Sequence, residues 1–359
     1  MRNMAYPTRR RALAALAGGA AAASAAAASA QTRPGGPITW RLQTHHPANS
    51  RIGESSDMFA KDVEKLSGGR MKITKLHSGA LIPNADIFKG ASTGIFEMGW
   101  SDPGYHVGFM PEAAIGTAPF MFQNIMDAFE LYYYRGVLDF YRESYAPHGV
   151  HLVSMMPAYV IPLLSKKPIR RVSDFKGLKV RTIGARQTMM IQLGASPVGI
   201  PLPEVYGALA SGAIDAATNG PEESFADFSW HEVAKFIIYP ALSSYPLPVN
   251  DIYVNAKAWS SLPDDLKAIV ESAGDLNFSR FAYHFRYGDF KVRDRYDKAG
   301  ITRIHLPSED NAALAAAASV VWTEIAKKSP RGREIVKRFT DYMRAMAYTD
   351  YDVNKAAPT

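Results

Sequence analysis

The segment from Lys167 to Pro221 places the tightest constraint on the fold, because it alternates short apolar strands, tight turns and one alanine-rich helix. A glycine turn at Gly177 leads into a short strand that ends on Arg181. A proline-containing turn and a helix over 203–211 follow, and a second short strand leads into a polar loop around Asn219. This strand–helix–strand order predicts an α/β sheet, in which ligands bind beyond the strand ends.

Arg181 and Asn219 each follow the end of a predicted strand and are the first candidates for ligand contact. The planar guanidinium group of arginine matches a carboxylate with two parallel hydrogen bonds. The alternative is a surface arginine in an ordinary ion pair, which is the more common role for a lone arginine. The residues alone leave both interpretations open.

Several motifs in this segment resemble the solute receptors of TRAP transporters, the tripartite ATP-independent periplasmic transporters of the dicarboxylate-receptor type. They are GLKVRT, GASPV, PEVYGALASGAID and the asparagine before Gly-Pro. The likeness continues through FAKDVEKLSGGRMKI, PEAAIGTAPFMF and NAKAWSSLPDDLKAIV. It implies a two-lobed α/β periplasmic-binding-protein fold with a ligand cleft between the lobes and a long bracing helix. In the family, the arginine of GLKxR pairs with the ligand carboxylate and the later asparagine helps to hold it, which assigns these roles to Arg181 and Asn219.

The same resemblance places three further side chains at the cleft. His45 falls where sialic-acid-binding members have an asparagine, Asp102 where they have a glutamate, and Tyr105 where they have an arginine. Because neighbouring residues of a strand point to opposite faces, at most one of His45 and His46 is expected to face the ligand. The pair lacks a matching third ligand, so we expect no metal site.

One position departs from the family pattern. Many acid-binding members carry a second arginine about twenty residues before the first, and that position is Ile161 here. Tyr159 and Arg186 are candidate substitutes, although a solvated Arg186 at a helix start is the favoured interpretation. Glu222 is a further ligand candidate, and the alternative for it is a first-turn acid stabilised by the helix dipole. The missing second cation predicts a preference for monocarboxylates over C4-dicarboxylates.

The amino-terminal thirty residues are typical of an export signal. A twin-arginine pattern around Arg9 and Arg10 precedes an alanine-rich run and the cleavage site Ala28-Ser29-Ala30. We therefore expect residues 1–30 to be removed and the protein to be periplasmic, by the twin-arginine route or by ordinary Sec export. Removal takes away four arginines and no acid, so the formal charge falls from +7 to +3. A charge this small gives no reason to expect nucleic-acid binding.

The remaining sequence excludes several function classes. The chain has no cysteine, so disulfides, thiol nucleophiles and cysteine metal sites are absent. Signatures such as GxGxxG and HExxH are missing, and we expect neither catalysis nor a cofactor. The partners that the resemblance implies are a small organic acid and the small and large integral membrane subunits of a TRAP transporter. A periplasmic enzyme acting on a carboxylic acid and a receptor of another transport or signalling system remain the alternatives.

The predicted organisation has two lobes. Lobe I comprises 37–157 plus 246–285, and lobe II comprises 158–245 plus 286–350. The apolar spacing predicts a strand–helix–strand opening with Ser55 or Ser56 as the helix cap, and one helix over 126–144. A nearly unbroken helical pattern over 263–298 predicts a helix long enough to span more than one small domain.

Overall fold

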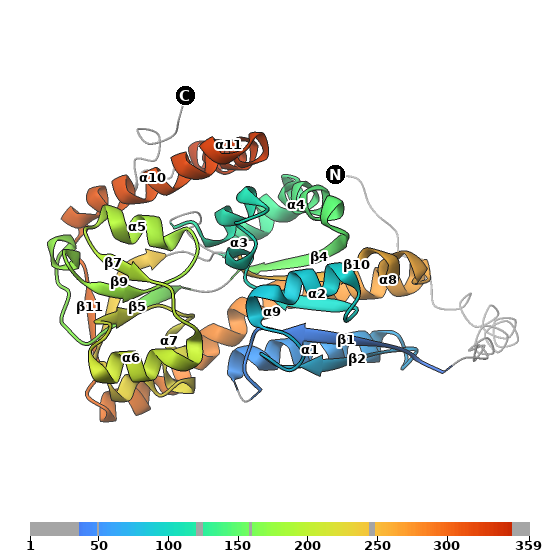
Figure 1. Cartoon of the computed structure of the whole chain (residues 1–359), viewed down its shortest axis with the longest axis horizontal. Helices are drawn as coiled ribbons and strands as arrows, with labels where there is room; N and C mark the ends of the chain where they lie inside the picture. The colour runs from blue at the N-terminus through green and yellow to red at the C-terminus, as the bar shows by residue number, and fades with distance from the viewer. Residues whose placement is uncertain (1–35, 49, 120–124, 158–159, 244–247, 347–359) are drawn as a thin grey trace, which may run out of the picture. The chain divides into compact units, whose positions relative to one another are not determined.

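The computed structural model describes residues 36–48, 50–119, 125–157, 160–243 and 248–346 (Figure 1). Contacts divide the chain into residues 1–38 and 39–359, and every described helix lies in the second unit. The proposed signal segment and Tyr159 lie outside the described residues. None of the described helices is both long and apolar enough to cross a membrane.

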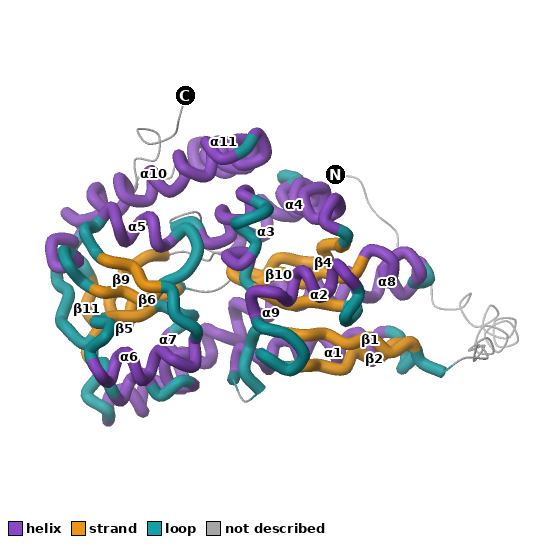
Figure 2. Tube along the Cα trace, viewed as in Figure 1, coloured by secondary structure: helices purple, strands orange, loops and turns teal. Residues whose placement is uncertain are grey.

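Two sheets organise the second unit, as the strands in Figure 2 show. The first has five strands, in the order β2 (Met71–Leu76), β1 (Ile38–Thr44), β3 (Met98–Ser101), β10 (Pro248–Asn255) and β4 (Val150–Pro157). β1 runs parallel to β3, whereas β10 runs antiparallel to both β3 and β4. A late segment of the chain therefore completes the sheet that the amino-terminal strands begin.

The second sheet has six strands, in the order β11 (Thr302–His305), β9 (Phe236–Ser243), β5 (Ile161–Ser165), β8 (Ala216–Ala217), β6 (Lys179–Arg181) and β7 (Ser196–Val198). β6 and β8 are parallel, with Arg181 opposite Ala217. The polypeptide leaves both strands at the same sheet edge, which brings Arg181 and the Asn219 loop together. The α/β fold is as the sequence predicts, and so is the helix before β8. The predicted turn after Arg181 is wrong, because the helix α5 (Arg186–Gln192) and the strand β7 lie between β6 and that helix.

The described α-helices cover both sheets. They are α1 (Arg51–Leu66), α2 (Ile87–Thr93), α3 (Ile125–Phe129), α4 (Val137–Tyr145), α5 (Arg186–Gln192), α6 (Val205–Ser211), α7 (Glu222–Asp227), α8 (Ala256–Ser261), α9 (Asp264–Lys298), α10 (Asn311–Lys328) and α11 (Pro330–Ala345). Strands β5 and β9, helices α6 and α7 and the turn at 230–232 together form one buried core, which includes Leu164, Val205, Phe225, Trp230 and Ile237.

The long helix α9 connects elements of both sheets, as its length in the sequence predicts. It packs against α1 and β4 of the first sheet and against α7, which follows β8 of the second. A Cβ atom added at Gly274 would lie 2.8 Å from Val153, and one at Gly288 would overlap the Glu223 carboxylate. Glycine costs stability inside a helix, and here it allows the helix to approach both neighbours closely.

Two further local predictions are wrong. The cap of α1 is Ser50, whose side chain accepts a hydrogen bond from the Gly53 N–H, and not Ser55 or Ser56. The predicted helix over 126–144 is interrupted, because α3 passes into a π-helical turn at 130–134 and Gly136 adopts φ +71° before α4 begins. Glycine permits this left-handed conformation at little cost. The lobe boundaries given above stay predictions.

Candidate ligand-binding site

A small cavity of about 30 Å³ lies where loops from both sheets meet. His45 and His46 follow β1, Asp102 follows β3, and Asn219 follows β8. The remaining lining includes Pro47, Leu202, Gly220, Pro221, Phe228, Asn250 and Phe285. Three of the residues singled out in the sequence, His45, Asp102 and Asn219, therefore line one cavity.

Arg181 is the last residue of β6 and is only 3% exposed. Its Nε–H donates to the Ile200 carbonyl at 3.1 Å and its Nη1–H to the Thr218 carbonyl at 2.7 Å. Burial lowers the pKa of Arg181 to about 10, so the group remains a cation at neutral pH. Two backbone carbonyls hold the guanidinium in one orientation, while Nη2 has no hydrogen-bond partner among the described residues.

Asp102 faces a second buried arginine. Its Oδ1 accepts a 2.7 Å hydrogen bond from the Gly104 N–H, and its Oδ2 lies 3.9 Å from Nη2 of Arg186. Burial raises the pKa of Asp102, and the positive charge of Arg186 opposes that shift. The distance to Arg186 is longer than a hydrogen bond, so the two charges attract without direct pairing.

The expectation of a solvated Arg186 is wrong, because this side chain is 2% exposed. The loop before it packs against the segment that follows Asp102. The Ala185 N–H donates to Thr117 Oγ1 at 3.0 Å, and a Cβ at Gly184 would lie 2.6 Å from the same oxygen. This close packing buries Arg186, the first residue of α5. At an exposed helix start the same side chain would be in contact with water.

Both histidines line the cavity, contrary to the expectation that one would point away. β1 ends at Thr44, so the strand alternation does not extend to them. The Nδ1 of His45 lies 3.2 Å from the Trp100 carbonyl, which requires the Nδ1–H tautomer in the neutral ring. The Nε2 of His46 lies 2.9 Å from Asn250 Oδ1. Burial lowers the pKa of both imidazoles, so both are neutral at pH 7.

Tyr105 and Asn219 complete the predicted set at this site. Tyr105 is half-buried, and its ring meets His45 edge-on with centroids 6.0 Å apart. Burial and the Asp102 carboxylate raise the pKa of Tyr105, whereas the Arg181 charge lowers it. Asn219 is also half-buried and lines the cavity. Asn219 thus lines the cavity, whereas Arg181 and Tyr105 do not, although Tyr105 lies against the lining residue His45.

Glu222 is engaged elsewhere. Its carboxylate accepts hydrogen bonds from Arg303 Nε at 2.8 Å and Nη2 at 2.7 Å, and from the Tyr239 hydroxyl at 2.6 Å. It does not line the cavity. We therefore do not carry Glu222 into the proposed ligand set. Ile161 is 1% exposed within β5, so that position supplies packing and no cation.

Asn250 and Phe285 are among the lining residues that were not predicted. Asn250 lies in β10, and its Oδ1 also accepts a hydrogen bond from the Trp100 indole at 2.9 Å. Phe285 lies on α9. Both are more than two hundred residues from β1 in sequence, and no local motif marks them.

A network of buried polar side chains surrounds the segment next to Asp102. Ser101 Oγ lies 3.0 Å from His106 Nε2, and His106 Nδ1 lies 3.3 Å from Asp251 Oδ2. This order resembles the geometry of a serine hydrolase, but each of the three side chains is at most 1% exposed. A substrate could not reach Ser101, so we interpret the network as support for the loop.

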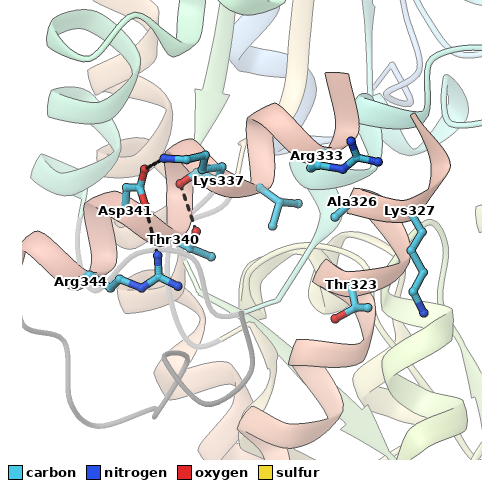
Figure 3. A pocket seen from close by; sticks show the side chains of 9 residues that line it. Thr323, Ala326, Lys327, Arg333, Lys337, Thr340, Asp341 and Arg344 are labelled. Carbon is cyan, nitrogen blue, oxygen red and sulfur yellow. Dashed lines mark hydrogen bonds and ion pairs between the residues drawn. The ribbon is translucent and has the colours of Figure 1, made fainter. Parts of the chain in front are cut away.

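A larger hollow of about 430 Å³ lies between α10 and α11 (Figure 3). Four cations surround it, namely Lys327, Arg333, Lys337 and Arg344. Lys337 and Arg344 pair with Asp341, and the Lys327 and Lys337 side chains are more than two thirds exposed. Charges in such contact with water bind small anions weakly. The described residues also contain no group of three or more acids and histidines that could hold a metal.

Comparison with known proteins places this chain in one family. The model of the bacterial extracellular solute-binding protein family 7 matches residues 42–329. A monocarboxylate 2-oxoacid-binding periplasmic protein of Nostoc is 31% identical over 238 residues, which are 66% of this chain and 65% of that protein. The ectoine-binding periplasmic protein TeaA of Halomonas elongata is 24% identical over 82% of this chain and 88% of its own.

Solved structures show the same fold. A TRAP transporter solute-binding protein from Bordetella bronchiseptica, with calcium and picolinate, has a TM-score of 0.80 at 23% identity and covers 87% of this chain and 94% of its own. One from Colwellia psychrerythraea, with bound calcium and pyruvate, has a TM-score of 0.77 at 25% identity over 89% and 98%. The chain thus belongs to family 7 of the bacterial extracellular solute-binding proteins, the periplasmic, non-enzymatic receptors of TRAP transporters.

Proposed function

We propose that this receptor binds a small monocarboxylate and delivers it to the membrane subunits of a TRAP transporter. The observation that carries the proposal is the Arg181 guanidinium, which is buried near the cavity residues and oriented by two backbone carbonyls. A cation held in this way meets a carboxylate without having to reorganise, and a dry site strengthens the attraction.

The charges around the cavity favour a monoanion. Arg181 and Arg186 supply two buried cations, and Asp102 supplies one buried acid. With Asp102 ionised, these three groups carry one net positive charge, which a single carboxylate neutralises. A dicarboxylate would leave an uncompensated negative charge in the closed site, and such a charge is costly.

The relatives support the same ligand class. The Nostoc protein is named for monocarboxylate 2-oxoacids, and the Colwellia structure contains pyruvate. The proposed ligands are therefore 2-oxo, 2-hydroxy or aromatic monocarboxylates. Arg181, Asn219, Asp102, Tyr105 and His45 form the proposed contact set, and Tyr159 remains a proposal outside the described residues.

Lobe closure is the proposed signal to the transporter. Lobe I would comprise 37–157 plus 246–285, and lobe II 158–245 plus 286–350. The ligand would contact side chains of both lobes, because Asp102 and His45 come from the first and Arg181 and Asn219 from the second. Binding would then stabilise the closed form relative to the open form.

Calorimetric titration with lactate, 2-oxobutyrate, mandelate, malate and succinate tests the proposed function. We expect at least one monocarboxylate to bind, and to bind more tightly than either dicarboxylate. Tight binding of malate or succinate with no response to any monocarboxylate would contradict the assignment. Mass spectrometry of the recovered ligand, unchanged after incubation, would confirm that binding occurs without turnover.

A further inference from the structure

Arg186 contains two donors that the protein does not satisfy. Its Nε and Nη1 atoms are fully buried and have no hydrogen-bond partner among the described residues. The nearest acid, Asp102, lies 3.9 Å from Nη2, beyond hydrogen-bond range. A buried charged donor without a hydrogen-bond partner lowers the free energy of unfolding, because its lost contact with water is not replaced. Such a group in a native protein therefore needs an explanation.

The position of Arg186 is set by the backbone and not by its charge. Gly184 has φ +62° and packs so closely that a Cβ there would lie 2.6 Å from Thr117 Oγ1. A Cβ at Gly104, two residues after Asp102, would lie 3.7 Å from the Gly184 Cα. With the Ala185 N–H bonded to Thr117 Oγ1, these contacts hold the start of α5 against the Asp102 loop.

This position is next to the proposed carboxylate anchor. The charge of Arg186 helps to lower the pKa of Arg181, so the two guanidinium groups interact electrostatically. Asp102, the charged neighbour of Arg186, is itself a wall of the cavity. Arg186 therefore lies beside a lining residue of the cavity, 3.9 Å from Asp102. We infer that its unsatisfied N–H groups reach an atom that extends from a carboxylate on Arg181.

The chemistry of the missing partner follows from arginine itself. A guanidinium group has five N–H donors and no acceptor, so its partner must be an acceptor such as a carbonyl or carboxylate oxygen. The charge count above leaves room for one carboxylate, which Arg181 takes. The acceptor that remains is an uncharged oxygen on the neighbouring carbon of the ligand.

We propose that Arg186 recognises the 2-oxo oxygen of the ligand, so that the receptor selects 2-oxo monocarboxylates over the same acids without that oxygen. The inference rests on the proposed function, in which Arg181 anchors the carboxylate. It makes Arg186 a specificity-determining residue, whereas Arg181 recognises any carboxylate. A 2-oxo monocarboxylate has no second carboxylate, so the receptor needs no cation in place of the arginine that is missing at Ile161.

Paired ligands on the intact mature protein test this role. Titration of wild type with 2-oxobutyrate and with butyrate gives a ratio of affinities that measures the contribution of the 2-oxo oxygen to binding. We expect a preference of about tenfold to a hundredfold for 2-oxobutyrate, the range for a hydrogen bond to a charged group. Arg186→Gln should bring the ratio close to one, mainly by weakening 2-oxobutyrate. Arg170→Gln, the same change at an exposed arginine, should leave the ratio unchanged.

The outcomes separate this proposal from the proposed function. Equal affinity of wild type for the two acids would overturn the role of Arg186, whether or not the variant folds. A parallel loss for both acids in Arg186→Gln, with the ratio preserved, would show that Arg186 acts only through Asp102 or the fold. If Arg186→Gln does not fold, Arg186→Lys keeps the charge and should still reduce the ratio. Wild type that binds no monocarboxylate at all would instead overturn the proposed function.

Discussion

Arg303 donates hydrogen bonds to both carboxylate oxygens of Glu222, with Nε 2.8 Å from Oε1 and Nη2 2.7 Å from Oε2. The pair links β11 to the start of α7, and the Tyr239 hydroxyl adds a third hydrogen bond from β9. Glu222 therefore joins three elements of the second sheet region. A carboxylate satisfied in this way has little to offer a ligand.

Removal of Arg303 should affect stability and not binding. Arg303→Met leaves Glu222, which is 5% exposed, without its charged partner. We expect the free energy of unfolding to fall by about 2–3 kcal/mol, below the loss for a wholly buried pair because the Arg303 side chain is 24% exposed. Urea unfolding and ligand titration on the same sample check both parts. Arg70→Met, at an exposed pair with Asp265, is the control and should change neither quantity appreciably.

Binding should depend on the shape of the Arg181 side chain as well as on its charge. Arg181→Ala leaves the ligand carboxylate buried without its partner, and we expect a loss of about 2–5 kcal/mol in binding free energy. Arg181→Lys should also bind weakly, because a point charge does not reproduce two parallel hydrogen bonds. Calorimetry measures both, with thermal unfolding to confirm that the variants are folded. Arg181→Ala that binds as tightly as wild type would refute the anchor.

Alanine substitutions at two glycines with similar backbone conformations distinguish the effect of backbone strain from the effect of side-chain packing. Gly177 has φ +77° and Gly184 has φ +62°, so alanine at either position costs about 1–2 kcal/mol of stability. Only Gly184 lies against Thr117, whereas a Cβ at Gly177 has nothing within 4 Å. We expect Gly184→Ala to weaken ligand binding and Gly177→Ala to leave it unchanged. Equal ligand affinity in the two variants would show that the Gly184 contact does not help to form the site.

The buried histidines should make stability fall on acidification. Burial lowers the pKa of His45 and His46 below the ordinary value of 6.5. As the pH falls through 6.5, the unfolded chain takes up protons that the folded protein does not, so the free energy of unfolding decreases. Each group contributes at most about 1.4 kcal/mol per pH unit in this window. Urea unfolding at pH 7.5, 6.5 and 5.5 measures the free energy of unfolding at each pH. This free energy should fall less steeply with decreasing pH for His46→Gln than for wild type.

Export gives a prediction outside the described residues. The twin-arginine pattern and the Ala28-Ser29-Ala30 site motivate removal of residues 1–30. Amino-terminal sequencing of periplasmic material should begin at or near Gln31. Recovery of a membrane-bound chain that retains Met1 would contradict this prediction.

The order of motifs in the chain was enough for the family, the α/β fold and the long helix, but the helix α5 and the strand β7 after Arg181 were missed. The predicted features depend on local periodicity and on turn residues that lie close together in sequence. The same motifs predicted Arg181 as a ligand contact. They also predicted His45, Asp102 and Asn219, which line the cavity. Local patterns were less reliable for interruptions, since Gly136 ends a helical turn that the apolar spacing continues.

What the sequence by itself determined is which side chains follow the strand ends, because strand and turn signals are local. Only the tertiary structure decided which charges are paired. Arg186 is buried because Gly184 packs on Thr117, and Glu222 is removed from the ligand set because Arg303 arrives from a strand 81 residues later. Both outcomes depend on contacts between distant segments, whose free energies arise only when the chain has folded.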